Sequence, residues 1–180
     1  MPATEPPVRL TPEEYELHVK SWLDAAGAGL LEYCSSHREV IVATDGRYEF
    51  DITCRFCALG ADFLVLVECK NSKNKVKREQ VQVLMAKLQS VGAQKAILCA
   101  TRGFQAGALT FARQHGIALV RVADGRSSWL TRDASCMTRP WSQVPDYIPR
   151  IVGWLIGETL GHESLVSEQH GEYLKKTLTF

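Results

Sequence analysis

The chain has 180 residues, of which 46% are hydrophobic and 23% are charged, and its formal net charge is +1. This length and composition allow one domain with a substantial core plus an appendage, and they leave too little chain for two independent enzyme domains. The small net charge argues against a protein that coats nucleic acid or an anionic membrane by bulk electrostatics.

The N-terminal residues 1–10 are rich in proline and show no hydrophobic periodicity, so we expect a disordered N-terminus. They have neither the basic start nor the apolar stretch of a signal peptide. No later segment approaches the roughly 20 apolar residues that a membrane-spanning helix needs, and the nearest candidate is the short run at 151–157. These features predict a cytoplasmic protein with no membrane segment.

A helix is predicted to begin at Thr11-Pro12-Glu13-Glu14, which combines an N-cap threonine, a proline at the first helical position and the glutamate of a capping box. The apolar residues that follow repeat at helical spacing: Tyr15, Val19, Trp22, Leu23 and Ala26. Gly27 and Gly29 predict the end of the helix. Glu16 lies beside the apolar stripe rather than opposite to it.

Three strands are predicted next, at residues 39–44, 48–56 and 63–70. The Asp45-Gly46 pair between the first two is a strong signal for a hairpin turn. The third strand, FLVLVECK, is apolar almost throughout, as expected of a central strand that is covered on both faces. Its polar residues arrive only at its C-terminal edge.

Helices and strands alternate in the next part of the chain, with a helix at 76–91, a strand at 95–101, a helix at 104–115 and a strand at 117–123. A strand, helix and strand in succession imply parallel pairing through a crossover. We therefore predict an α/β core over residues 11–123, with the element order αβββαβαβ and a mixed central sheet flanked by helices.

Residues 124–180 are predicted to form an accessory, C-terminal helical extension. A polar stretch with several prolines comes first, and helices are expected at 150–160 and 163–176. The tryptophans of this region are more typical of a small appended core than of a surface that stacks on nucleic-acid bases. They are Trp129, Trp141 and Trp154.

Three charged residues stand out in the predicted strands. Asp51 lies in the second strand, and Glu68 and Lys70 lie two positions apart on the third, so Glu68 and Lys70 project from the same face. Adjacent strands can bring all three together. Two carboxylates are hard oxygen ligands for Mg²⁺ or Mn²⁺, and a bound metal lowers the pKa of its water. A partly desolvated Lys70 with a depressed pKa would orient or deprotonate that water.

The segments YEFDITC, FLVLVECK and GAQKAILCATRGFQAGALTFARQHGIALV resemble the catalytic domain of Mrr-like restriction endonucleases, within the PD-(D/E)xK nuclease superfamily. The likeness covers about residues 11–123 and includes the order of elements as well as the short motif. The resemblance implies a restriction-endonuclease-like fold. It also implies a catalytic centre formed by Asp51, Glu68 and Lys70, in which Asp51 and Glu68 bind the metal.

The resemblance further implies roles for residues on two helices. Many proteins of the superfamily place a glutamate of the first helix near the metal, and the Tyr-Glu pair of this helix makes Glu16 the matching catalytic residue. The alternative for Glu16 is an i,i+4 ion pair with Lys20. The glutamine that follows the lysine motif in the family corresponds to Gln80 or Gln82, which would contact either the DNA backbone or only solvent.

A run of basic residues follows the third strand. The segment NSKNKVKR contributes Lys73, Lys75, Lys77 and Arg78. Residues 52–180 hold seventeen basic and ten acidic residues, whereas residues 1–51 hold four and ten, so a polyanion would meet the later part of the chain. Basic runs are usually solvated loops, but this one lies within reach of the predicted site, and we expect it to contact DNA phosphates.

The cysteines and histidines predict no second site. Cys54 and Cys57 form a lone CxxC with no further zinc ligands at suitable spacing, and Cys69 must point away from the face that carries Glu68. We expect reduced, structural thiols. The five histidines are scattered along the chain, and none has a persuasive partner in the sequence.

These features predict a divalent-metal-dependent DNA endonuclease that hydrolyses phosphodiester bonds, with Mg²⁺ or Mn²⁺ as its cofactor and DNA as its partner. The alternative is a catalytically silent nuclease fold that binds DNA or another protein, and such a module would typically lack a member of the Asp51, Glu68 and Lys70 trio. One site of this kind cuts one strand. Cleavage of both strands would require two copies, which suggests a homodimer.

Overall fold

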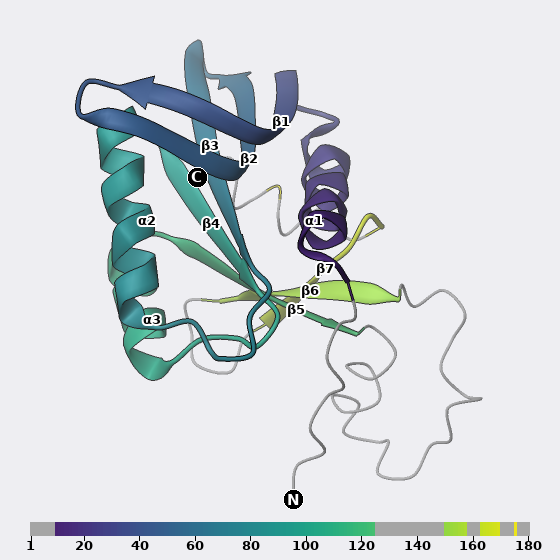
Figure 1. The fold of residues 1–180 in the computed structure, drawn as a ribbon. Coiled ribbons are helices and arrows are strands. Elements are labelled where there is room, and N and C mark those ends of the chain that lie inside the picture. Colours follow the sequence, from purple (N-terminus) through teal and green to yellow (C-terminus); the bar gives the residue numbers. More distant parts are fainter. Residues whose placement is uncertain (1–9, 125–149, 158–162, 170–174, 176–180) are drawn as a thin grey trace, which may run out of the picture.

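The computed structural model describes residues 10–124, 150–157, 163–169 and 175 (Figure 1). Over these residues one sheet forms, in which the spatial order of the seven strands is their order along the chain. The strands are β1 (Leu31–Ala43), β2 (Gly46–Ala58), β3 (Ala61–Lys70), β4 (Lys95–Ala100), β5 (Ala118–Asp124), β6 (Ile151–Ile156) and β7 (Glu163–Val166). The helices are α1 (Pro12–Gly27), α2 (Arg78–Val91) and α3 (Ala106–Gln114).

The sheet is mixed. Antiparallel pairing joins β1, β2 and β3, parallel pairing joins β3, β4 and β5, and antiparallel pairing joins β5, β6 and β7. The parallel pairs are connected by crossovers through α2 and α3, as the succession of strands and helices predicts. Figure 1 shows α1 on one side of the sheet and α2 with α3 on the other. The predicted restriction-endonuclease-like core with helices on both faces is confirmed.

Helix α1 begins where its capping box predicts. The Thr11 hydroxyl accepts a hydrogen bond from the Glu14 amide at 3.2 Å, and the Glu14 carboxylate accepts one from the Thr11 amide at 2.8 Å. The apolar face of the helix is buried against β2, β3 and the later strands, where Ile52, Cys54 and Val67 receive it. This packing fixes the polar residues at the rim of α1 relative to the sheet.

The opposite face of the sheet is covered by α2 and α3. Leu66 of β3 and Leu98 of β4 pack there against Val81 and Leu84 of α2. Helix α2 ends at Gly92, which has a φ of 68° and donates its amide to the carbonyls of the last helical turn. The C-terminal end of β3 therefore faces α2 on one side and α1 on the other.

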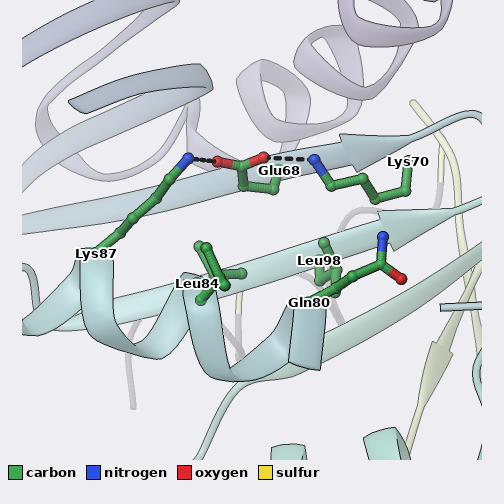
Figure 2. A pocket seen from close by; sticks show the side chains of 7 residues that line it. Glu68, Lys70, Gln80, Leu84, Lys87 and Leu98 are labelled. Carbon is green, nitrogen blue, oxygen red and sulfur yellow. Dashed lines mark hydrogen bonds and ion pairs between the residues drawn. The ribbon is translucent and has the colours of Figure 1, made fainter. Parts of the chain in front are cut away.

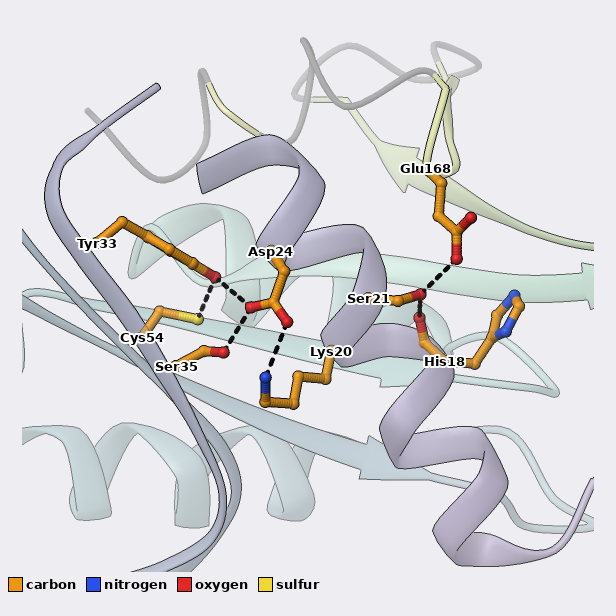
Figure 3. A network of polar contacts seen from close by, with 8 residues as sticks. All are labelled: His18, Lys20, Ser21, Asp24, Tyr33, Ser35, Cys54 and Glu168. Carbon is orange, nitrogen blue, oxygen red and sulfur yellow. Dashed lines mark hydrogen bonds and ion pairs between the residues drawn. The ribbon is translucent and has the colours of Figure 1, made fainter. Parts of the chain in front are cut away.

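Strand β1 is longer than the predicted strand, since it begins at Leu31 rather than near residue 39. Its first half has polar side chains that point to polar partners on α1, so the sequence there lacks the usual apolar alternation. The Tyr33 hydroxyl donates to Asp24 at 3.2 Å, and the Ser35 hydroxyl donates to the same carboxylate (Figure 3). The hairpin is thus anchored to α1 by hydrogen bonds as well as by apolar contacts.

The side chains of the hairpin change faces halfway along it. Ile52 packs with α1, but Phe50, two positions earlier on β2, packs with α2 and α3, although alternate residues of a regular strand share a face. On β1, Arg38 stands between the partners of Ile52 and Phe50, and its φ of 52° departs from regular strand geometry at the point where the faces change. The paired register of β2 and β3 ends at Ile52 and Val67, so the hairpin leaves the sheet next to Asp51.

The expected C-terminal helices are wrong at residues 151–156 and 163–166, which are strands, whereas residue 175 is helical as expected. Residues 151–156 form β6, which pairs with β5, and residues 163–166 form β7. Ile151 and Val166 are buried on the α1 side of the core, because β6 continues the sheet at the free edge of β5. The predicted domain boundary at residue 124 is therefore crossed by the sheet.

Some expectations concern residues outside the described part of the chain. These are the disordered N-terminus at 1–9 and the packing of Trp129 and Trp141. Trp154 lies on β6 opposite Arg121 of β5. None of the described helices is both long enough and apolar enough to cross a membrane.

Candidate active site

Glu68 lies near the C-terminal end of β3 and points toward α2. Only 6% of the residue is exposed. Lys70 donates to its Oε2 at 2.9 Å, and Lys87 of α2 donates to its Oε1 at 2.5 Å (Figure 2). Glu68 and Lys70 therefore share one face of β3, as predicted, and both oxygens of the carboxylate are paired with ammonium groups.

Burial and ion pairing have opposite effects on the charges of this cluster. Burial works to raise the pKa of Glu68, but the hydrogen bonds and charges of Lys87 and Lys70 outweigh it and hold the pKa below its ordinary value. Burial works to lower the pKa of Lys70, but the contact with Glu68 outweighs it and the pKa is raised. The expected depressed pKa of Lys70 is wrong, because Glu68 stabilises the ammonium form.

Asp51 lies where the β1–β2 hairpin separates from β3. Its Oδ2 accepts a hydrogen bond from the Cys69 amide at 2.6 Å, so the carboxylate binds a strand amide beyond the end of the paired register. Burial raises the pKa of Asp51, the charge of Glu68 raises it further, and the Cys69 amide and Lys70 only partly oppose them. Among the described residues Asp51 has no cationic partner in a direct ion pair.

Glu16 lies on the α1 side of the same region and is also buried. Its carboxylate binds His37 Nε2 at 2.8 Å and Arg38 Nε at 3.0 Å, both on β1. The alternative pair with Lys20 is wrong, since Lys20 binds Asp24 at 2.8 Å (Figure 3). The charge of Glu16 contributes to the raised pKa of Asp51, so the two carboxylates lie within electrostatic reach of each other.

A cavity of ≈ 190 Å³ adjoins Glu68 on the α2 side. Its lining residues are Glu68, Lys70, Gln80, Val83, Leu84, Lys87 and Leu98. Gln80 thus lies at the site, as Figure 2 shows, and its side-chain oxygen also accepts a hydrogen bond from the Lys77 amide at 2.9 Å. Gln82 is exposed on α2 and is not part of the lining.

The basic segment lies between β3 and α2, directly after Lys70. Its basic residues are exposed: Lys73, Lys75, Lys77 and Arg78. The segment is held by Val76, whose amide donates to the Gly103 carbonyl at 3.0 Å and whose carbonyl accepts from the Gln105 amide at 2.9 Å. The Arg78 guanidinium lies 5.3 Å from the ring centroid of Phe111 on α3, so Arg78 contacts an aromatic ring as well as solvent.

The cysteines are placed as structural thiols. Burial raises the pKa of Cys54 to about 11, and hydrogen bonding to Asp62 raises the pKa of Cys57 to about 12, so both remain protonated at neutral pH. Cys54 packs toward α1, as does Cys69, which confirms that the Cys69 side chain points away from the face of Glu68. Neither thiol of the CxxC resembles a metal ligand.

The donor set of the site fits a hard divalent cation. Asp51 is a partly buried carboxylate without its own ion pair, and Glu68 is a second carboxylate that already binds two ammonium groups, so the two acids together can attract a cation. Two carboxylates suffice for Mg²⁺, which keeps several of its waters. No cluster of three or more acidic, histidine or cysteine side chains suited to a metal occurs in the part of the chain that the structure describes.

Two residues of the site have partners that the sequence does not reveal. Lys87 lies three positions after Leu84 on α2, and this spacing is the one signal that places it on the helix face toward the sheet. His37 lies in a polar part of β1 and meets Glu16 only because the hairpin packs on α1. Neither follows from a motif.

Comparison with known proteins gives one family and one structure. A family model named Mrr_cat, described as a restriction endonuclease, matches residues 8–125. The chain is also similar to a crystal structure described as a protein of unknown function, AF1548. The two sequences are 15% identical, the TM-score is 0.43, and the similarity covers 57% of this chain. The similarity covers 56% of that structure's chain. No curated protein matches.

Proposed function

Because the chain belongs to the Mrr_cat restriction endonuclease family, we propose that it is a divalent-metal-dependent DNA endonuclease that hydrolyses phosphodiester bonds. The observation that supports this activity is that Asp51 lies within electrostatic reach of Glu68 and Lys70 near the C-terminal end of β3, where residues of β3, β4 and α2 line a cavity beside Glu68 and Lys70. All three members of the motif are present, and charged groups of this kind give no packing advantage to a sheet.

Each residue of the centre has a proposed role. Asp51 and Glu68 would hold Mg²⁺ or Mn²⁺, which when bound supplies a Lewis acid and lowers the pKa of a coordinated water. Lys70 keeps its positive charge beside Glu68 and is suited to orient a water or a phosphate oxygen. Glu16, held by His37 and Arg38, adds negative charge on the α1 side of Asp51.

The DNA is proposed to pass the C-terminal end of β3. Gln80 lines the cavity and would contact the backbone near the scissile phosphate. The exposed cations that precede and begin α2 would contact neighbouring phosphates: Lys73, Lys75, Lys77 and Arg78. Gln82 lies further along the exposed face of α2, where it would reach only a phosphate outside the cavity. We further propose a homodimer for cleavage of both strands.

Three variants test the activity: Asp51→Ala, Glu68→Ala and Lys70→Ala. Each should lower Mg²⁺-dependent nicking of plasmid DNA by at least about 100-fold, since each removes a group that acts on the metal or the reacting water. The carboxylate variants should also lose Mn²⁺ binding in calorimetric titration. Lys70→Ala should keep or increase Mn²⁺ affinity, because the site becomes more negative when the ammonium is removed.

The controls are charged residues of α1 and β3 that lie away from the site. Lys20→Ala removes the ion pair with Asp24, and Asp62→Ala changes the opposite end of β3, so both should nick DNA like the unaltered protein. Circular dichroism must show that every variant is folded. If folded Lys70→Ala cleaves DNA at the unaltered rate, the catalytic assignment is wrong and a silent DNA-binding or protein-binding module takes its place.

A further inference from the structure

Both oxygens of Glu68 are bound by lysines that come from different elements. Lys70 belongs to β3, two residues from Glu68, and is the lysine of the nuclease motif. Lys87 comes from the last turns of α2 and binds Oε1 at 2.5 Å, closer than Lys70 binds Oε2 at 2.9 Å. The motif assigns no role to Lys87, so its contact with the carboxylate needs its own explanation.

The Lys87 ammonium lies among three groups that attract a cation. Besides Glu68, it donates to the Glu49 carbonyl at 3.3 Å and lies 5.3 Å from the centroid of the Phe50 ring. Glu49 and Phe50 belong to the part of β2 that turns away from β3 and folds toward α2. Lys87 therefore contacts both the buried Glu68 carboxylate and the β1–β2 hairpin. Its hairpin contact at Phe50 directly precedes Asp51 in the sequence.

The local charges balance only because Lys87 is present. Asp51 and Glu68 are two acids in a partly dehydrated region, and an ionised carboxylate in such a region is costly without a cation. Lys70 and Lys87 supply two positive charges. A divalent cation that binds both carboxylates would bring the same amount of charge to the same oxygens, so the cation and Lys87 compete for Oε1 of Glu68.

We propose that Lys87 is the counter-ion of Glu68 in the metal-free protein and is displaced when a divalent cation binds, so that Lys87 sets the metal affinity of the site. The inference rests on the proposed function, because it takes Asp51 and Glu68 as the metal ligands. The adjoining cavity of ≈ 190 Å³, which Lys87 itself lines, gives the displaced ammonium room to move. Lys87 is thus a positioning residue rather than a metal ligand.

The test compares Mn²⁺ binding by calorimetry in the unaltered full chain, Lys87→Gln, Lys87→Arg and Lys20→Gln. Lys87→Gln should bind Mn²⁺ about tenfold more tightly because no cation competes for Oε1. Lys87→Arg keeps the charge and should stay close to the unaltered affinity. Lys20→Gln removes a lysine from a comparable pair with Asp24, remote from Glu68, and should change nothing.

Thermal unfolding gives a second readout. In EDTA, Lys87→Gln should melt at a lower temperature than the unaltered protein, because Glu68 is deprived of a partner. Saturating Mn²⁺ should then raise its Tm by more than it raises that of the unaltered protein, since tighter binding to the folded state gives more stabilisation. If Lys87→Gln is not folded in EDTA, Lys87→Met, which keeps most of the apolar stem, replaces it.

The outcomes separate the inference from the function on which it rests. An unaltered protein that binds no Mn²⁺ contradicts both. An unaltered protein that binds Mn²⁺, with equal or weaker binding by Lys87→Gln and Lys87→Met, overturns the inference alone and reduces Lys87 to a structural ion pair. Tighter binding by the neutral variants, together with unaltered affinity in Lys87→Arg, supports displacement of a counter-ion.

Discussion

Asp51 and Glu68 are neighbouring carboxylates whose charged forms are favoured to different degrees. The pKa of Glu68 is lowered by its lysine partners, so its contribution to stability is present above the ordinary pKa of glutamate and is lost as the pH falls through the lowered value. The pKa of Asp51 is raised by burial, so its contribution is present below the ordinary pKa of aspartate and is lost as the pH rises through the raised value. At neutral pH, ionised Asp51 therefore disfavours the metal-free fold.

Asp51→Asn should stabilise the metal-free protein while removing a metal ligand. The amide oxygen of asparagine can still accept the hydrogen bond from the Cys69 amide, and no charge is left to desolvate. Asp51 is only partly buried, so the expected rise in Tm in EDTA at pH 7 is small, about 2 °C. The difference should disappear below about pH 4, where aspartate is protonated even when unfolded.

Glu68→Gln is the matched comparison, and it should lower the Tm at pH 7 because two lysines lose their anion. Scanning calorimetry of both variants over a pH series in EDTA provides the measurement. A lower Tm for Asp51→Asn than for the unaltered protein at pH 7 would mean that ionised Asp51 stabilises the metal-free fold. That result would contradict the raised pKa of Asp51.

The sequence predicts those site residues whose positions depend on strand geometry. Glu68 and Lys70 share a face because they are two apart on one strand, and Asp51 lies near them because its strand is adjacent. Lys87 and His37 are different. Their contacts depend on how α2 and the hairpin dock on the sheet, which no short pattern in the chain records.

Among the elements, the β3–α2 connection is the one expected to meet DNA first. Replacing Lys73, Lys75 and Lys77 with glutamine should weaken DNA binding to a similar extent for unrelated sequences. It should also flatten the salt dependence, by a slope of about 0.9 for each phosphate that is no longer neutralised. The backbone of the connection should be unaffected, because it is held through Val76. Fluorescence anisotropy at several salt concentrations measures both effects.

A triple variant of cations outside the connection, the half-buried Lys20 and the exposed Arg47 and Arg113 changed to glutamine, provides the matched decrease in charge. It should leave most of the salt dependence in place, since none of these residues lies in the connection after Lys70. If the two triple variants bind DNA equally, DNA affinity depends only on the net charge of the protein, and the connection is ordinary solvated surface.

At the same scale, elements with a strong local signal are predicted well and the terminal strands are not. The capping box of α1 is sufficient to predict where that helix begins, and the apolar run of β3 is sufficient to predict a central strand. The run IVGWLI is too short for its hydrophobicity to separate a helix from a buried strand. It becomes β6 because the edge of β5 offers it backbone partners, and that edge is a property of the assembled sheet.

For the whole molecule, Gly153 of β6 marks the point where the late strands meet α1. A Cβ at this position would lie 2.8 Å from Val120 Cγ1 and 2.9 Å from Trp22 Cζ3, so Gly153→Ala should force the helix and the sheet apart. We expect a decrease in stability of about 2 kcal/mol, or about 4–8 °C in Tm. Gly107→Ala, on helix α3, is the matched control. A Cβ at residue 107 would meet only the Cβ of Arg78 on α2, at an ordinary contact distance of 3.7 Å.

Thermal unfolding of the two alanine variants decides whether β6 belongs to the main core. Gly107→Ala should keep or raise the Tm, since alanine favours a helix more than glycine does. A Tm for Gly153→Ala equal to that of the unaltered protein would contradict the packing of β6 between Val120 and Trp22, and would make the C-terminal segment a separate unit from the 8–125 family match.

The agreement between strand order and chain order has a consequence for how the protein is made. No described strand has to be inserted between two earlier ones, so each strand that emerges from the ribosome can pair at once with the strand synthesised before it. Such nearest-neighbour pairing keeps the sequence separation of contacts short and favours rapid folding. Asp51, Glu68, Lys70 and Lys87 all precede β4, so the charged centre can begin to assemble while half of the chain is still being translated.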